Sequence, residues 1–202
     1  MSSTDERNQR HKRAMQRKKE YIDGKIAEAT VDKGLLVVLT GNGKGKSSSA
    51  FGMLARSVGH GLHCAVVQFI KGQWETGEQL LFQDHPLVEF HVMATGFTWD
   101  TQDREADIVA ARATWAKAEA LLKNPDVDVI ILDELTYMLT YGYLDKATVL
   151  AALADRPPMQ HVIVTGRNAA KELIELADTV SELGETRHAF NAGVKVQKGI
   201  DY

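Results

Sequence analysis

A short apolar run that leads directly into a glycine-dense turn is the feature that most limits how this 202-residue chain can fold. The run is Leu35–Leu39, and the turn reads Thr-Gly-Asn-Gly-Lys-Gly-Lys-Ser over residues 40–47. Glycines let backbone N–H groups converge on an anion, and the helix-like segment that follows adds the positive potential of its N-terminus. The pattern therefore predicts a strand, a phosphate-binding loop and a helix, as in nucleotide-binding proteins. A glycine-rich turn without a ligand is the alternative.

This phosphate loop (residues 40–47) supplies most of the candidate nucleotide ligands. Lys46 is expected to reach the outer phosphates, and the Ser47 hydroxyl to bind a magnesium ion. The usual pattern begins with glycine where this chain has Thr40, and the glycine comes one residue later. Arg56, ten residues after Lys46, either contacts the nucleotide or is a solvent-exposed helix charge. The predicted ATP-binding residues are Gly41, Asn42, Gly43, Lys44, Gly45, Lys46, Ser47, Ser48 and Arg56.

A second hydrophobic run, Val129–Leu132, ends in two acids, Asp133 and Glu134. Mg²⁺, or Mn²⁺ in its place, prefers oxygen ligands such as carboxylates, a hydroxyl and phosphate oxygens. Ser47, Asp133 and Glu134 are therefore the candidate metal ligands. Because adjacent residues on an extended strand point to opposite faces, only one of the two acids is expected to touch the metal directly. Two acids at a strand end without a metal is the alternative.

Strand-like and helix-like segments alternate along the rest of the chain. The expected strands are residues 35–39, 64–70, 88–93, 127–132 and 161–165, with a short edge strand at 179–183. The expected helices are residues 46–60, 78–83, 103–122, 135–141, 146–154 and 169–177. Mainly apolar strands that alternate with helices predict an α/β fold, with a mainly parallel sheet covered by helices on both faces. Ligands should then lie beyond the carboxyl ends of the strands.

The first 33 residues differ in composition from the rest of the chain. They hold nine Lys or Arg and six Asp or Glu, a net +3, so the remainder carries −6 of the total −3. Met15, Ile22, Ile26 and Ala29 follow a loose helical spacing, interrupted by Gly24. This N-terminal arm is expected to be either a conditional helix that docks or a disordered segment. A basic nucleic-acid arm is a third option, which the interspersed acids weaken. Residues 34–202 are expected to form one catalytic domain.

Composition excludes several classes of protein. Cys64 is the only cysteine, which excludes an internal disulfide framework and a cysteine metal cluster. The N-terminus has no apolar stretch like that of a signal peptide, and no run reaches membrane-spanning length. We therefore expect a cytoplasmic protein with no membrane partner. The net charge of −3 argues against a protein whose whole surface binds nucleic acid.

Two large aromatic residues, Phe97 and Trp99, lie in the loop 95–99 at the ligand edge of the expected sheet. Such rings can line a pocket for a large flat ligand. The alternative is that both rings simply pin the loop to the core.

Taken together, these motifs closely resemble the ATP:corrinoid adenosyltransferases of the phosphate-loop type, which act on cob(I)alamin or cob(I)yrinic acid a,c-diamide. The resemblance runs from about Lys33 to Tyr202 and is less distinctive over the arm. The most specific stretches are Met93-Ala-Thr-Gly-Phe-Thr-Trp99 and Leu132-Asp-Glu-Leu-Thr-Tyr137. The others are Thr40-Gly-Asn-Gly-Lys-Gly-Lys-Ser47, Val67-Gln-Phe-Ile-Lys-Gly72, Val164-Thr-Gly-Arg167 and His188-Ala-Phe-Asn-Ala-Gly193.

The resemblance implies a RecA-like homodimer that transfers the 5′-deoxyadenosyl group of ATP to Co(I) of a corrinoid and releases triphosphate, in cobalamin biosynthesis and salvage. It implies a reversed nucleotide, so that the ribose C5′ is exposed instead of the γ-phosphorus. It also implies that Lys46, Phe97 and Trp99 are catalytic, with both rings beneath a cobalamin- or cobinamide-type corrinoid. Reduced flavodoxin is the implied electron donor, the arm is the implied lid, and Glu134 is favoured over Asp133 as metal ligand.

Two other classes of function remain open at the level of residues. A phosphoryl-transferring ATPase or kinase would use the same phosphate loop and acids. A RecA-like nucleic-acid-binding module would use the basic arm, and its affinity would fall steeply with salt.

Overall fold

The computed structural model describes residues 3–70, 75–93 and 103–201. The chain divides into two compact units, Met1–Asp32 and Lys33–Tyr202. The first unit is helix α1 (Ser3–Glu28), in which the side chains of residues 4–28 are all exposed. Bonds along its surface, from Gln16 to Glu20 at 2.9 Å and from Lys25 to Glu28 at 2.8 Å, support a solvated helix. The arm is helical over Ser3–Glu28. That this helix is conditional, and that it docks, are still predictions.

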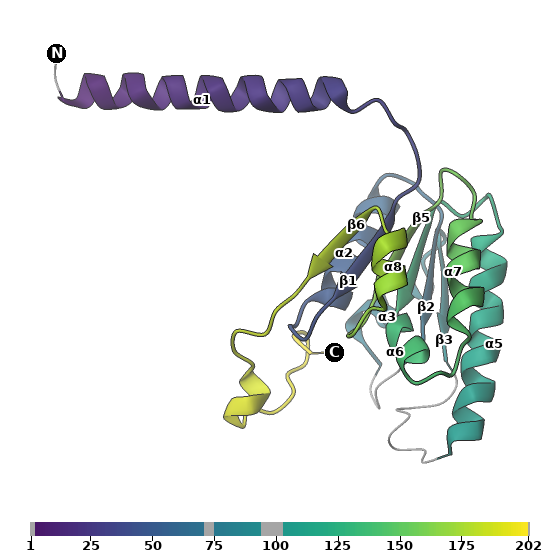
Figure 1. The fold of residues 1–202 in the computed structure, drawn as a ribbon. Helices are drawn as coiled ribbons and strands as arrows, with labels where there is room; N and C mark the ends of the chain where they lie inside the picture. Colours follow the sequence, from purple (N-terminus) through teal and green to yellow (C-terminus); the bar gives the residue numbers. More distant parts are fainter. Residues whose placement is uncertain (1–2, 71–74, 94–102, 202) are drawn as a thin grey trace. The chain divides into compact units, whose positions relative to one another are not determined.

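The second unit is built on a six-stranded sheet in which every neighbouring pair is parallel, in the order β3-β2-β4-β5-β1-β6 (Figure 1). The strands are β1 (Leu36–Thr40), β2 (Cys64–Gln68), β3 (Val88–Val92), β4 (Val129–Asp133), β5 (His161–Thr165) and β6 (Thr179–Glu182). Because all six run the same way, their carboxyl ends lie along one edge of the sheet. Strand β5 lies between β1 and β4, so the ends of these three strands are neighbours.

Helices cover both faces of this sheet (Figure 1). One face carries α2 (Lys46–Gly59) and α3 (Gly77–Phe82), which pack Ala50, Phe51, Leu54 and Phe82 against the strands. On the other lie α5 (Arg104–Leu122), α6 (Leu135–Thr140), α7 (Lys146–Ala154) and α8 (Lys171–Leu176). A short 3₁₀ helix, η1 (Ala189–Ala192), follows β6. The central strands are apolar on both sides because each side faces a core.

The structure confirms the predicted fold class, a P-loop-type α/β unit with a parallel sheet and helices on both faces. Helix α7 and strand β5 begin and end at the predicted residues. The second strand ends at Gln68, two residues before the predicted end at Ile70. Strand β4 begins at Val129, two residues after the predicted start at Val127, and ends at Asp133. Among the described residues, no helix combines the length and the apolar character needed to cross a bilayer.

Candidate active site

The phosphate loop connects the carboxyl end of β1 to the first turn of α2. Gly41 and Gly45 adopt left-handed backbone angles, with φ of 98° and 112°, which side chains rarely tolerate. The segment after β6 closes on this loop: Gly43 N donates to Leu183 O at 2.6 Å, and Leu183 N donates to Thr40 O at 2.8 Å. A Cβ atom on Gly43 would lie 2.5 Å from the Gly184 carbonyl oxygen, so the loop needs glycine there.

Lys46 begins α2 and is only 7% exposed. Its ammonium group donates to the carbonyl oxygen of Gly43, in its own loop, at 2.7 Å. Burial lowers the pKa of Lys46, and the nearby Glu134 carboxylate opposes that shift. The loop therefore holds a cation that has lost most of its water, beside the start of α2. Such a cation is well suited to bind an anionic group strongly.

Asp133 ends β4 and is held by the two neighbouring strands. Its Oδ1 accepts from Thr165 Oγ1 at 2.7 Å, and its Oδ2 accepts from Gln68 Nε2 at 3.1 Å. Thr165 Oγ1 also accepts from Glu134 N at 2.9 Å. Both oxygens of the Asp133 carboxylate are therefore already engaged by the protein.

Glu134 differs from Asp133 although the two are adjacent. Both were expected to continue the strand, but β4 ends at Asp133, and Glu134 takes a left-handed backbone with φ of 59°. Its Oε2 is buried and has no hydrogen-bond partner among the described residues. Burial and the Asp133 charge raise the pKa of Glu134 to about 7. A buried, unpartnered carboxylate oxygen is suited to bind a cation.

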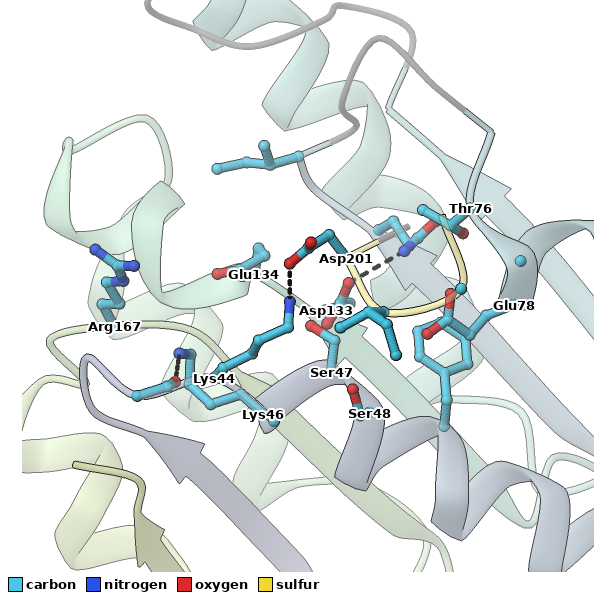
Figure 2. Close-up of a pocket in the computed structure, with 18 of the residues that line it drawn as sticks. Lys44, Lys46, Ser47, Ser48, Thr76, Glu78, Asp133, Glu134, Arg167 and Asp201 are labelled. Carbon is cyan, nitrogen blue, oxygen red and sulfur yellow. Dashed lines mark hydrogen bonds and ion pairs between the residues drawn. The ribbon is translucent and has the colours of Figure 1, made fainter. Parts of the chain in front are cut away.

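A pocket of about 550 Å³ brings these groups together (Figure 2). Of the predicted site residues it is lined by Asn42, Gly43, Lys44, Gly45, Lys46, Ser47, Ser48, Asp133 and Glu134. Gly41 shapes the loop but does not line the pocket. Arg56 is exposed in the last turn of α2 and does not line the pocket either. Phe97 and Trp99 lie outside the described residues, in the segment that links β3 to α5.

The pocket also contains residues that the sequence motifs did not single out. Thr76 and Glu78 come from the start of α3. Tyr137, from α6, ends one of the quoted stretches but was given no role there. The end of the chain contributes as well, through His188, Gly199, Ile200 and Asp201. The Val164-Thr-Gly-Arg167 stretch pointed to Arg167, an exposed lining residue. His188 begins one of the quoted stretches but was given no role there. No sequence signal marked Gly199, Ile200 and Asp201, because the tail has no hydrophobic periodicity.

Residues that could hold a divalent metal are present in this pocket. No cluster of three or more His, Cys, Asp or Glu side chains placed to bind a metal occurs within the parts of the chain that the structure describes. Ser47, Asp133 and Glu134 nevertheless share the pocket. Two carboxylates and a hydroxyl fit a hard cation such as Mg²⁺, which takes further ligands from phosphate and water. Among these groups, Glu134 Oε2 is the buried carboxylate oxygen without a partner in the described residues, so it is the candidate for direct contact with the cation.

A strand, a glycine-rich loop with a buried lysine, and an acid-ended strand across the same pocket define a protein of the P-loop α/β class. Residues 32–202 match the family described as "ATP:corrinoid adenosyltransferase BtuR/CobO/CobP". The chain belongs to this family.

Several relatives are similar over nearly their whole length. The "Corrinoid adenosyltransferase" of Pseudomonas aeruginosa is 53% identical, with 100% of each chain covered. The "Corrinoid adenosyltransferase" of Escherichia coli K12 is 53% identical over 96% of this chain and 98% of that protein. The "Corrinoid adenosyltransferase CobA" of Salmonella typhimurium LT2 is 52% identical over the same shares. These comparisons confirm the resemblance seen in the motifs and identify the chain as a transferase of this type.

Proposed function

We propose that the protein transfers the 5′-deoxyadenosyl group of ATP to the Co(I) centre of a reduced corrinoid. The products are triphosphate and adenosylcobalamin or its precursor, in cobalamin biosynthesis and salvage. The observation that carries this proposal is the buried Lys46 ammonium in a pocket shared with Glu134, in a chain of this family. This arrangement favours a polyanionic leaving group, because both the loop amides and the lysine are in place before the reaction begins.

The reaction balances as an in-line displacement at carbon. The Co(I) substrate donates an electron pair to the ribose C5′, a cobalt–carbon bond forms, and the C5′–O bond breaks. The bonding pair leaves with the triphosphate, whose developing charge is held by Lys46 and the amides of residues 44–46, since the Gly43 amide already donates to Leu183 O. Electrostatic stabilisation of a leaving group in a dry site is among the largest contributions that an enzyme can make.

Ser47 and Glu134 are the proposed metal ligands. Asp133 is proposed to orient the site, since Thr165 and Gln68 already engage both of its oxygens. When bound, Mg²⁺, or Mn²⁺ in its place, would neutralise part of the polyphosphate charge. The Glu134 carboxyl group must lose its proton to bind the cation. The raised pKa of Glu134 makes cation binding sensitive to pH near neutrality.

The acceptor side of the proposal rests on the family resemblance. Phe97 and Trp99 would pack beneath a cobalamin- or cobinamide-type corrinoid and displace its lower ligand, because their rings offer no donor lone pair. Cobalt without that ligand would be easier to reduce, with reduced flavodoxin as the electron donor. A cytoplasmic homodimer, in which the arm (residues 1–33) is a lid over the corrinoid, completes the proposal. Membrane and nucleic acid have no part in it.

A spectroscopic assay tests the proposal. Chemically reduced cob(I)alamin is mixed with the protein and MgATP in the dark. We expect the absorption spectrum of a cobalt–carbon bond to appear, and to be lost on exposure to light. Omission of ATP is the control. Failure to form any light-sensitive product with either cobalamin or cobinamide would contradict the proposed function.

A further inference from the structure

The C-terminal segment (residues 185–201) lies at the mouth of the nucleotide pocket. Four of its residues line the pocket: His188, Gly199, Ile200 and Asp201. Apart from His188, which is half-buried, every residue of the segment is exposed. The segment therefore reaches the site without being packed into the core.

One ion pair connects the end of this segment to the phosphate loop. The Lys44 ammonium lies 2.6 Å from Asp201 Oδ1, and Figure 2 shows the pair directly above the loop. The Lys44 and Asp201 side chains are 44% and 25% exposed. Asp201 is itself fixed by a turn, in which Oδ2 accepts from Gln197 N and Asp201 N donates to Gln197 O, each at 2.8 Å.

The rest of the C-terminal segment is bonded only to itself. Its other bonds, such as Asn191 Nδ2 to Glu185 Oε1 at 2.8 Å and Val194 N to Ala189 O at 3.1 Å, join neighbours in the sequence. Between the described residues, the Lys44–Asp201 pair is the single hydrogen bond or ion pair that joins residues 185–201 to the remainder of the unit. Loss of this contact would release the segment at little cost, since an exposed ion pair stabilises a protein only weakly.

Asp201 and a polyphosphate make competing demands on Lys44. Lys44 lines the pocket within the phosphate loop, so its ammonium is within reach of nucleotide phosphate. An aspartate carboxylate beside a bound polyphosphate would place like charges next to each other, which is unfavourable. The same lysine cannot serve both anions at full strength.

We infer that the C-terminal segment is an anionic latch: Asp201 occupies Lys44 before the nucleotide arrives, and the polyphosphate must displace it. This inference rests on the proposed function, because ATP is the ligand that opens the latch. The latch would screen Lys44 from smaller anions, which cannot compensate for the lost ion pair with further contacts to the loop.

Asp201→Asn, which removes the charge and keeps the shape, tests the latch in the full chain. Calorimetric titration with MgATP requires no corrinoid. We expect Asp201→Asn to bind MgATP about twofold to fivefold more tightly than the wild type, as the loss of an exposed ion pair allows. The gain should shrink in high salt, because salt screens exposed charges. In a Lys44→Gln background, Asp201→Asn should change the affinity very little.

The matched control is Asp126→Asn, at an exposed site in the turn before β4 and hence at the opposite edge of the sheet. It makes the same change in net charge and should leave the MgATP affinity unchanged. Amide hydrogen exchange gives a second readout: peptides from residues 185–201 should exchange faster when MgATP is added.

Equal affinities for wild type and Asp201→Asn would overturn the latch and leave the proposed function standing. Weaker binding by Asp201→Asn, or slower exchange in the tail with MgATP, would also overturn it and make the segment part of the nucleotide site. No binding of MgATP by the wild type would overturn the proposed function, and the latch with it.

Discussion

Lys46 and Glu134 are charged in water, yet Lys46 is buried and one carboxylate oxygen of Glu134, Oε2, is buried in the same pocket. Burial lowers the pKa of the lysine and raises that of the glutamate to about 7. Each group is therefore held at an electrostatic cost that an unliganded structural role does not explain. A polyphosphate and a divalent cation would satisfy both groups at once.

Lys46→Ala removes the buried cation from the leaving-group site. We expect kcat for adenosyl transfer to fall by at least about 100-fold, the usual loss when one preorganised charge or donor is removed. The rate is measured with chemically reduced corrinoid, so that no reductase limits it. Lys123→Ala, at an exposed site in the turn after α5, is the control and should keep the wild-type rate. A wild-type rate for Lys46→Ala would show that the site is misassigned.

Glu134→Gln should change stability in a pH-dependent way. The folded-state pKa of about 7 lies above the ordinary value of 4.5. The unfolded chain therefore ionises first, and the wild type loses stability as pH rises from 4.5 to 7. Above pH 7 the full penalty, on the order of 3 kcal/mol, is present. We expect Glu134→Gln to be more stable than the wild type at pH 8 and close to it at pH 5.

Denaturant unfolding without nucleotide or metal measures this difference. Glu175→Gln, at an exposed site on α8, is the matched control and should show no such pH dependence. Added Mg²⁺ and ATP should stabilise the wild type more than Glu134→Gln, which lacks one proposed metal ligand. A stability difference that is the same at pH 5 and pH 8 would argue against the raised pKa.

Trp99→Ala tests the proposed displacement of the lower corrinoid ligand. We expect a larger loss of rate when the reaction starts from Co(II) with a reductant than when it starts from Co(I). Both rates are followed by the absorbance of the adenosylated product. Equal losses with the two starting substrates would remove Trp99 from the reduction step.

At the scale of elements, the phosphate loop depends on the segment that follows β6. Gly43→Ala would bring a Cβ to 2.5 Å from Gly184 O and 2.7 Å from Leu183 O, which are backbone atoms that cannot easily move. We expect a loss of about 1–3 kcal/mol of stability, as in other overpacked sites, together with weakened ATP binding.

Gly52→Ala is the matched control for this change. Gly52 lies in the middle of α2. Apart from its two chain neighbours and the helix backbone, no atom of the described residues lies within 4 Å of the place that an alanine Cβ would take. Alanine there should raise the free energy of unfolding by up to about 1 kcal/mol, through helix propensity. Thermal melts of both variants show whether the two substitutions have opposite signs. Melts shifted in the same direction would contradict the close packing of residues 183 and 184 on the loop.

At the scale of the whole molecule, the two units are expected to have different roles: the second unit binds ATP, and the arm acts on the turnover of corrinoid. Deletion of residues 1–32 removes a helix whose described side chains are exposed, so the melting temperature of the remainder should change little. ATP binding should persist, while turnover of corrinoid falls if the arm is a lid. Unchanged turnover of corrinoid would exclude the lid, and loss of folding would show that the arm is structural.

The sequence predicted the fold well because the strands and helices carry local signals. Apolar β-branched runs flanked by glycine and proline indicated where the strands lie. Asp103 and Asp145 cap the N-termini of α5 and α7. The site was harder to predict where distant residues meet. The Lys44–Asp201 pair joins residues 157 positions apart, and no periodicity marks either partner. The left-handed backbone of Glu134 also depends on Thr165, which the strand order brings beside it.

In the proposed reaction, carbon and not phosphorus is attacked. Phosphorus NMR of a reaction with cob(I)alamin and ATP tests it most directly, because the three possible phosphate products have distinct spectra. We expect intact triphosphate in a one-to-one ratio with the adenosylated corrinoid, and no phosphate release when corrinoid is omitted. Orthophosphate or diphosphate as the primary product, with no cobalt–carbon bond formed, would contradict the proposed reaction.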